Sequence, residues 1–205
     1  MTADELDKDF NELLNTQGFG FLKVEGVGKG KKGAFASVTL KLDRSIDAKL
    51  LERAIQANDE VTTILLFGLE IEHQLSLFLT GLIGKLPENA NFHTLTLLLK
   101  GVRFDNDIYT VVDGFRRLRN KFAHDKGASL VQCTKIVDAI LQCEPPTPMD
   151  QPLNRVNNQD ISAYPTISKL AIFANLAVLF LASATQIYSF PKPVKRVLLT
   201  TSKSE

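Results

Sequence analysis

From Asp43 almost to the end of the chain, apolar residues recur every three or four positions. That spacing places them on one face of an α-helix. Capping residues, glycines and prolines divide this region into segments of helical length. The pattern therefore predicts an all-α, up-and-down helical bundle with helices over 45–57, 59–84, 92–104, 108–124, 130–141 and 165–188.

The first 45 residues have a different pattern. Apolar residues at helical spacing predict a short amphipathic helix over 3–15. Phe19–Val27 and Ala34–Leu42 are rich in strand-forming residues and enclose a Gly/Lys-rich segment, which predicts a β-hairpin. We expect an N-terminal helix plus β-hairpin extension over 1–45, a helical bundle domain over 46–190 and a flexible tail over 191–205.

One apolar stretch, Leu170–Phe190, has about the 20 residues that a membrane span requires. Polar side chains at Asn175 and Ser183 interrupt it, and no charged flanks mark an orientation. A helix that is apolar on all sides is also what the interior of a bundle contains. We therefore expect a buried core helix and no membrane partner.

Composition describes an ordinary globular protein. The 205 residues are 44% hydrophobic and 23% charged, and the net charge is +1, so disorder and a general attraction to polyanions are both excluded. Cys133 and Cys143 have neither disulfide-framework nor zinc spacing, so we expect buried, reduced thiols. The acidic N-terminal residues are unlike a targeting signal, which predicts a cytoplasmic location.

Two motifs suggest small ligands only weakly. Gly28–Gly33 matches G-x-G-x-x-G, but a strand-like run follows it where a dinucleotide site requires a helix. Glu70 and His73 share one helix face, yet the second such pair that a carboxylate-bridged metal site requires is missing from the sequence. We therefore expect no cofactor and no metal.

The segment Phe115–Asp125, with sequence FRRLRNKFAHD, is the most informative. On a helix its apolar residues would face the core, and a polar face would carry an arginine, an amide and an imidazole. Basic side chains near a helix C-terminus also have a plain structural role, because they complement the helix dipole. The expected core residues are Phe115, Leu118 and Phe122, the polar face is Arg116, Asn120 and His124, and Arg119 lies between the faces. The expected nucleic-acid-binding residues are Arg116, Arg117 and Lys121.

The run Arg119-Asn120-Lys121-Phe122-Ala123-His124 resembles the R-N-x-x-x-H signature of the HEPN superfamily. Over Asp59–Tyr188 the order of helices resembles its mannitol-operon-repressor family, in which Glu70 would be the inward carboxylate of the long first helix. This resemblance implies a HEPN-type bundle. The N-terminal extension has no counterpart in it.

The resemblance implies two functions. In the first, the chain is a regulatory protein that has no helix-turn-helix for binding DNA and acts by binding another protein. Arg119 and His124 would then hold the helix end through hydrogen bonds to carboxylates such as Glu70 or Asp125. In the second, the chain is a metal-independent endoribonuclease on single-stranded RNA: His124 is the general acid/base, Arg119 stabilises the phosphate and Asn120 orients them across a dimer interface. We favour the regulator, and expect a homodimer whose interface includes Phe115–His124.

Overall fold

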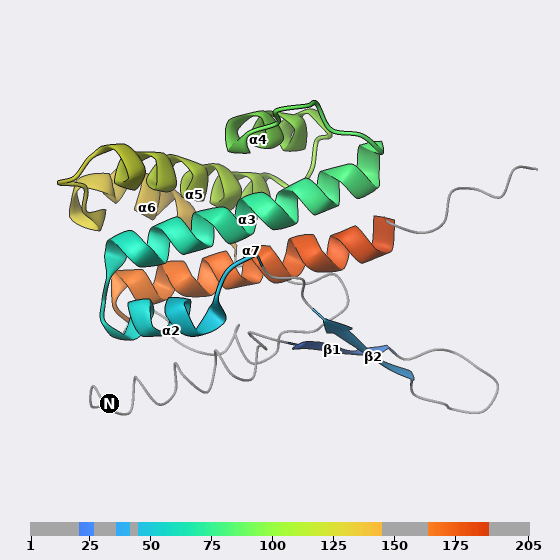
Figure 1. Cartoon of the computed structure of the whole chain (residues 1–205), viewed down its shortest axis with the longest axis horizontal. Coiled ribbons are helices and arrows are strands. Elements are labelled where there is room, and N and C mark those ends of the chain that lie inside the picture. Colours follow the sequence, from blue (N-terminus) through green and yellow to red (C-terminus); the bar gives the residue numbers. More distant parts are fainter. Residues whose placement is uncertain (1–20, 27–35, 42–44, 145–163, 189–205) are drawn as a thin grey trace, which may run out of the picture.

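The computed structural model describes residues 21–26, 36–41, 45–144 and 164–188. These residues are mostly helical, as predicted. Two long helices, α3 and α7, lie side by side and run in the same direction, and α5 runs opposite to both (Figure 1). The helices are α2 (Ala48–Gln56), α3 (Glu60–Ile83), α4 (Phe92–Gly101), α5 (Asn106–His124), the short 3-10 helix η1 (Leu130–Cys133), α6 (Thr134–Leu141) and α7 (Thr166–Tyr188).

Polar side chains define where four helices begin. Asp47, Asp59, Asn91 and Asp105 each accept a hydrogen bond from a backbone N–H in the first turn of the following helix. These groups have no partner within the helix itself, so the caps satisfy donors that would otherwise be unpaired. The starts of α2 and α3 therefore agree with the prediction to within a few residues.

The core lies between α3, α5 and α7. Phe67 of α3 packs against Phe115 of α5 with ring centroids 6.2 Å apart. At the other end, Phe104 lies between Phe78 of α3 and Phe180 of α7, at 5.0 and 5.6 Å. Every described side chain from Leu170 to Leu181 is buried, which is the burial expected of a core helix.

α7 is also long and apolar enough to cross a membrane by length and composition. Within the bundle, however, 89% of that stretch is buried. Its apolar surface is thus already covered by protein.

Two helices differ from the prediction. α4 ends at Gly101 rather than Phe104, because Arg103 has a positive φ of 52° and no longer continues the helix. This turn places the partly buried ring of Phe104 against the core. The predicted helix over 130–141 is divided into η1 and α6 at Cys133.

Before the bundle, two strands, β1 (Phe21–Gly26) and β2 (Ala36–Lys41), pair antiparallel, with Phe21 opposite Lys41 and Gly26 opposite Ala36. They fall within the two runs that suggested a hairpin. The predicted helix over 3–15, the Gly/Lys-rich tip, the long loop after Glu144 and the C-terminal tail lie outside the described residues.

Both cysteines are free thiols, as predicted. Cys133 is buried, whereas Cys143 is only half-buried and follows the end of α6, so the prediction of two buried thiols is wrong for Cys143. Burial is the main cause that raises the pKa of each thiol above its usual value.

Candidate functional site

The helix that carries the signature residues is α5, and its apolar stripe faces the core as predicted. Phe115 and Leu118 are fully buried, and Phe122 is 5% exposed. Asp105 caps the first turn of α5, and Lys121 and His124 lie in its last turn. The core contacts fix the rotation of α5, and this rotation determines where each polar side chain lies.

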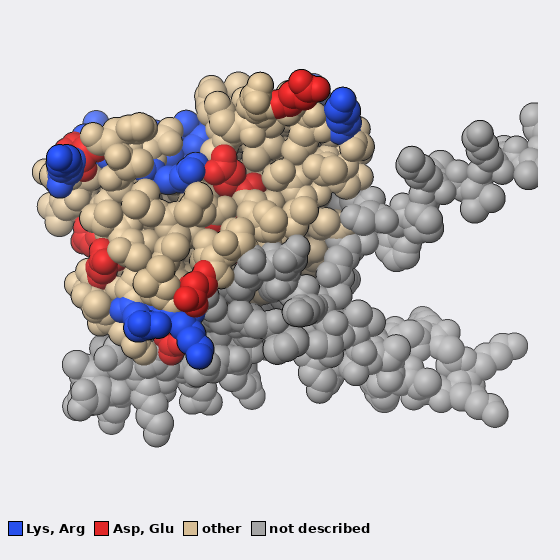
Figure 2. Space-filling view, in the orientation of Figure 1, with Lys and Arg blue, Asp and Glu red and all other residues tan. Residues whose placement is uncertain are grey.

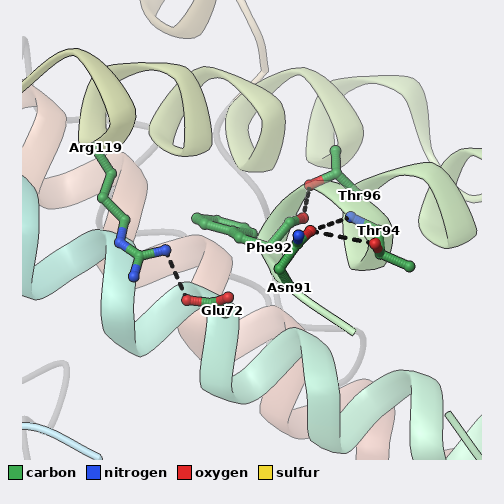
Figure 3. Close-up of polar contacts among 6 residues, drawn as sticks. All are labelled: Glu72, Asn91, Phe92, Thr94, Thr96 and Arg119. Carbon is green, nitrogen blue, oxygen red and sulfur yellow. Dashed lines mark hydrogen bonds and ion pairs between the residues drawn. The ribbon is translucent and has the colours of Figure 1, made fainter. Parts of the chain in front are cut away.

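Arg119 lies in the groove between α5, α3 and the start of α4 (Figure 3). Its Nη1 donates to Oε2 of Glu72 at 2.7 Å, and its guanidinium lies 5.8 Å from the ring centroid of Phe92. About a quarter of each charged side chain is exposed, 26% for Arg119 and 23% for Glu72. Arg119 therefore joins three helices.

Phe92 is held in this position by the start of α4. The side chain of Asn91 accepts hydrogen bonds from the N–H and hydroxyl of Thr94, and the hydroxyl of Thr96 donates to the carbonyl of Phe92 (Figure 3). The ring is 3% exposed, so it offers one face to the arginine and is otherwise packed. This arrangement favours a cation over the ring.

The other two signature residues do not join this contact. Asn120 and His124 are exposed, and neither side chain makes a hydrogen bond or ion pair with any residue that the structure describes. His124 lies five positions after Arg119, which turns their side chains about 140° apart around the helix axis. Within one chain the three predicted catalytic residues are therefore not assembled into a single site.

The predicted basic residues have different surroundings. Arg116 is paired with Asp113 at 2.7 Å, so its charge is largely balanced. Arg117 is exposed. Lys121 pairs with Asp125 at 2.6 Å, and this hydrogen bond raises the pKa of Lys121 and lowers the pKa of Asp125.

A pocket of about 440 Å³ lies beside this basic end of α5. Arg117 and Lys121 line it from α5, and Thr134 and Lys135 line it from α6. Three cationic side chains therefore surround one open pocket. Pairing with Asp125 reduces the contribution of Lys121.

Glu70 is inward-facing, and its side chain is 1% exposed. Its partners are not Arg119 or His124. Oε2 accepts from the N–H and the hydroxyl of Ser45, and Oε1 accepts from the amide of Gln74. The prediction that Arg119 and His124 hold the helix end through carboxylates such as Glu70 or Asp125 is therefore wrong in its partners. Arg119 pairs with Glu72, Asp125 pairs with Lys121, and the side chain of His124 has no carboxylate partner among the described residues.

His73 is half-buried, and its Nε2 is buried with no hydrogen-bond partner among the described residues. In the described part of the chain, no three His, Cys, Asp or Glu side chains are grouped so that they could hold a metal ion.

Sequence reasoning missed Glu72, Phe92 and Gly68 as neighbours of Arg119. Glu72 is 47 positions from Arg119, and no local spacing rule joins residues that far apart. Gly68 could have indicated this contact from the sequence, because a glycine in the interior of a helix often marks a close approach of another element.

Comparison with known proteins adds no relatives, since no family model, curated protein or solved structure matches this chain.

Proposed function

We propose that this chain is a cytoplasmic regulatory protein with a HEPN-like bundle, similar in role to the mannitol-operon-repressor family, and that it acts by binding another protein. The observation that carries the proposal is the contact of Arg119. Its guanidinium is already held by Glu72 and Phe92, in a position where it ties α5 to α3 and α4. An arginine that joins three helices has a structural role that requires no substrate.

The position of His124 supports the same conclusion. A general acid/base acts on an atom within hydrogen-bond reach, and a phosphate-stabilising arginine must reach the same phosphate. Here the imidazole is exposed at the end of α5, while the guanidinium faces the other way into the interhelical groove. RNA cleavage would require Arg119 to leave Glu72 or a second subunit to supply the missing group.

Incubation of the full chain with single-stranded RNA in a chelator tests this proposal. We expect no cleavage by the wild type and none by His124→Ala. Arg119→Ala should lower stability rather than remove an activity. Chelator-resistant cleavage that disappears in a folded His124→Ala protein would replace the regulatory proposal with a nuclease.

A second experiment tests the regulatory role directly. Transcripts of a sugar-alcohol operon would be compared in cells that lack the chain and in cells that express it. We expect lower transcript levels with the wild type and an intermediate effect with Arg119→Ala. Equal transcript levels in both strains would count against this role.

The endoribonuclease remains the second candidate because of the basic pocket. Arg117, Lys121 and Lys135 surround an open cavity on the side of α5 where Asn120 and His124 are exposed. Lysine and arginine side chains at such a position attract phosphates, and the attraction weakens as salt increases. Salt-sensitive RNA binding that Arg117→Ala and Lys135→Ala weaken, together with cleavage, would favour this candidate.

A further inference from the structure

The pocket beside the C-terminal end of α5 receives cations from two helices. Arg117 and Lys121 are four positions apart and therefore share one face of α5, and Lys135 lines the pocket from the first turn of α6. Figure 2 shows Lys and Arg side chains gathered over α5, toward its C-terminal end. None of the described residues that line the pocket is Asp or Glu. The pocket is therefore a local positive site on a chain whose net charge is only +1.

Two of these three cations are not balanced within the chain. Arg117 and Lys135 are exposed, and neither side chain forms an ion pair with any residue that the structure describes. Lys121 is instead held by Asp125 at 2.6 Å. A carboxylate, or one phosphodiester group of RNA, would balance only one of the two remaining charges. A phosphomonoester carries a charge of about −1.5 to −2 at neutral pH and so matches both.

The pocket has room for more than a phosphate group. Its volume of about 440 Å³ is within the range of roughly 300–1,000 Å³ that is typical of small-molecule sites. Gln132 and Thr134 add an amide and a hydroxyl to its lining, and the half-buried Ile136 adds apolar surface. A ligand whose phosphate is held by the cations would therefore have space beside them for an uncharged organic part.

We propose that this pocket between α5 and α6 binds a small molecule that carries a phosphomonoester group. The planar guanidinium of Arg117 can donate two parallel hydrogen bonds to phosphate oxygens, and Lys135 supplies the second positive charge. The first turn of α6 lines the same pocket, and the helix dipole adds partial positive charge there. Cations that converge on one pocket from two helices hold an anion better than a row of cations on an open helix face.

Asp125 limits how strongly the pocket attracts an anion. Its carboxylate holds Nζ of Lys121 and also accepts a hydrogen bond from the backbone N–H of Gly127. A bound phosphate therefore competes with Asp125 for the ammonium group of Lys121. Removal of the Asp125 charge should release Lys121 to the ligand and strengthen binding.

This inference does not rest on the regulatory function. The contact of Arg119 with Glu72, which carries that function, lies in the groove toward α3 and uses none of the residues that line the pocket. A regulator and a nuclease could each bind such a ligand. Failure of phosphate binding would therefore leave the outcomes of the transcript and RNA-cleavage experiments unchanged.

Isothermal titration calorimetry of the full chain with phenyl phosphate is the test. Phenyl sulfate is the matched ligand, because it has a similar shape but only one negative charge. We expect one saturable site for phenyl phosphate and at least tenfold weaker binding of phenyl sulfate. Arg117→Gln and, separately, Lys135→Gln should weaken phenyl phosphate binding at least tenfold, because each removes a charged hydrogen-bond donor. Asp125→Asn should strengthen it severalfold.

Lys126→Gln is the control variant. Lys126 is exposed just beyond the end of α5 and does not line the pocket, so its substitution removes the same charge from the same region and should leave binding unchanged. Circular dichroism confirms that each variant is folded, which we expect because Arg117 and Lys135 are exposed.

Three results would overturn the proposal. The first is no binding of phenyl phosphate by the wild type, or equal binding by the wild type and the Arg117→Gln and Lys135→Gln variants. The second is equal affinity for phenyl sulfate, or equal losses in the Lys126→Gln control, which would indicate a general attraction to anions. The third is tighter binding of a single-stranded RNA with hydroxyl ends, weakened by the same two variants, which would assign the pocket to RNA. Unchanged binding by Asp125→Asn would exclude Lys121 from the site.

Discussion

Gly68 of α3 lies directly against the side chain of Arg119. A Cβ atom at position 68 would be 2.8 Å from Cδ and 2.9 Å from Cβ of Arg119, which is closer than carbon atoms approach without displacement. The missing side chain of Gly68 is therefore what allows Arg119 to lie along α3 and reach Glu72. The ion pair between Arg119 and Glu72 therefore depends on Gly68, although Gly68 is not part of the pair.

Gly68→Ala should displace Arg119 and lower the free energy of unfolding by about 1–2 kcal/mol. The clash of an overpacked site costs roughly 1–3 kcal/mol, and the better helix propensity of alanine recovers up to about 1 kcal/mol. Urea denaturation measures the change. Gly101→Ala is the control, because a Cβ there meets nothing within 4 Å and should be neutral or stabilising. Equal effects at both positions would contradict the packing described here.

Arg119→Ala should lower the free energy of unfolding by about 1 kcal/mol. The loss is modest because the ion pair with Glu72 is partly exposed to solvent and therefore screened. Arg119→Lys should keep the charge but lose part of the contact with Phe92, and it should fall between alanine and wild type. A double-mutant cycle with Glu72→Gln isolates the pair energy. A coupling energy near zero would mean that the ion pair contributes nothing to stability.

Asp59 should make stability fall in acid. Its hydrogen bonds, first with the side chain and then with the backbone of Thr62, hold the pKa of this carboxyl below the ordinary value of 3.8. A carboxyl with a lowered pKa in the folded state stabilises the protein above its unfolded pKa, and this contribution is lost as the pH falls through the folded pKa. The loss should therefore occur below about pH 4.

Asp59→Asn keeps an N-cap acceptor that does not titrate. Compared with the wild type, this variant should lose less stability between pH 5 and pH 3 in denaturant titrations. Asp59→Ala should instead be less stable at neutral pH by about 1 kcal/mol. Identical pH profiles for wild type and Asp59→Asn would show that the cap does not titrate as described.

The two thiols should react at different rates. Cys143 is half-buried and Cys133 is 5% exposed, so an aromatic disulfide reagent should modify Cys143 first in the folded protein. Burial raises the pKa of both thiols, so both rates should be low at neutral pH and increase as the pH approaches or exceeds the ordinary value of 9.0. Cys143→Ser should leave one thiol that reacts mainly after unfolding. Rapid labelling of that variant would contradict the burial of Cys133.

The helix boundaries were predictable where a local signal defines them. Asp47 and Asp59 precede apolar runs and cap the helices that follow, so the sequence alone was enough to place α2 and α3. The end of α4 was not predictable, because the positive φ of Arg103 breaks an apolar pattern that continues to Phe104. Only the contacts of Phe104 with Phe78 and Phe180 explain why the chain turns there.

The site was predictable in its core residues but not in its partners. Periodicity placed Phe115, Leu118 and Phe122 correctly, because the spacing of a helix fixes which side chains share a face. It did not identify Glu72 as the partner of Arg119, since that contact depends on how α5 packs against α3. The requirement for glycine at position 114 likewise depends on the packing of two helices. A Cβ atom there would lie 2.5 Å from Cγ1 of Ile140 in α6, and the pattern of α5 alone does not reveal this contact.

The hydrogen bonds from Ser45 to Glu70 have a consequence for exchange with solvent. The backbone N–H of Ser45 precedes the first helix of the bundle, yet it donates at 2.9 Å to a carboxylate that is 1% exposed. An amide held in this way exchanges its proton only when the structure around it opens. In deuterium oxide, the Ser45 amide should therefore retain its proton longer than those of its exposed neighbours, and Glu70→Gln should shorten that lifetime. The rate at this one amide would report how firmly the segment that precedes α2 is attached to α3.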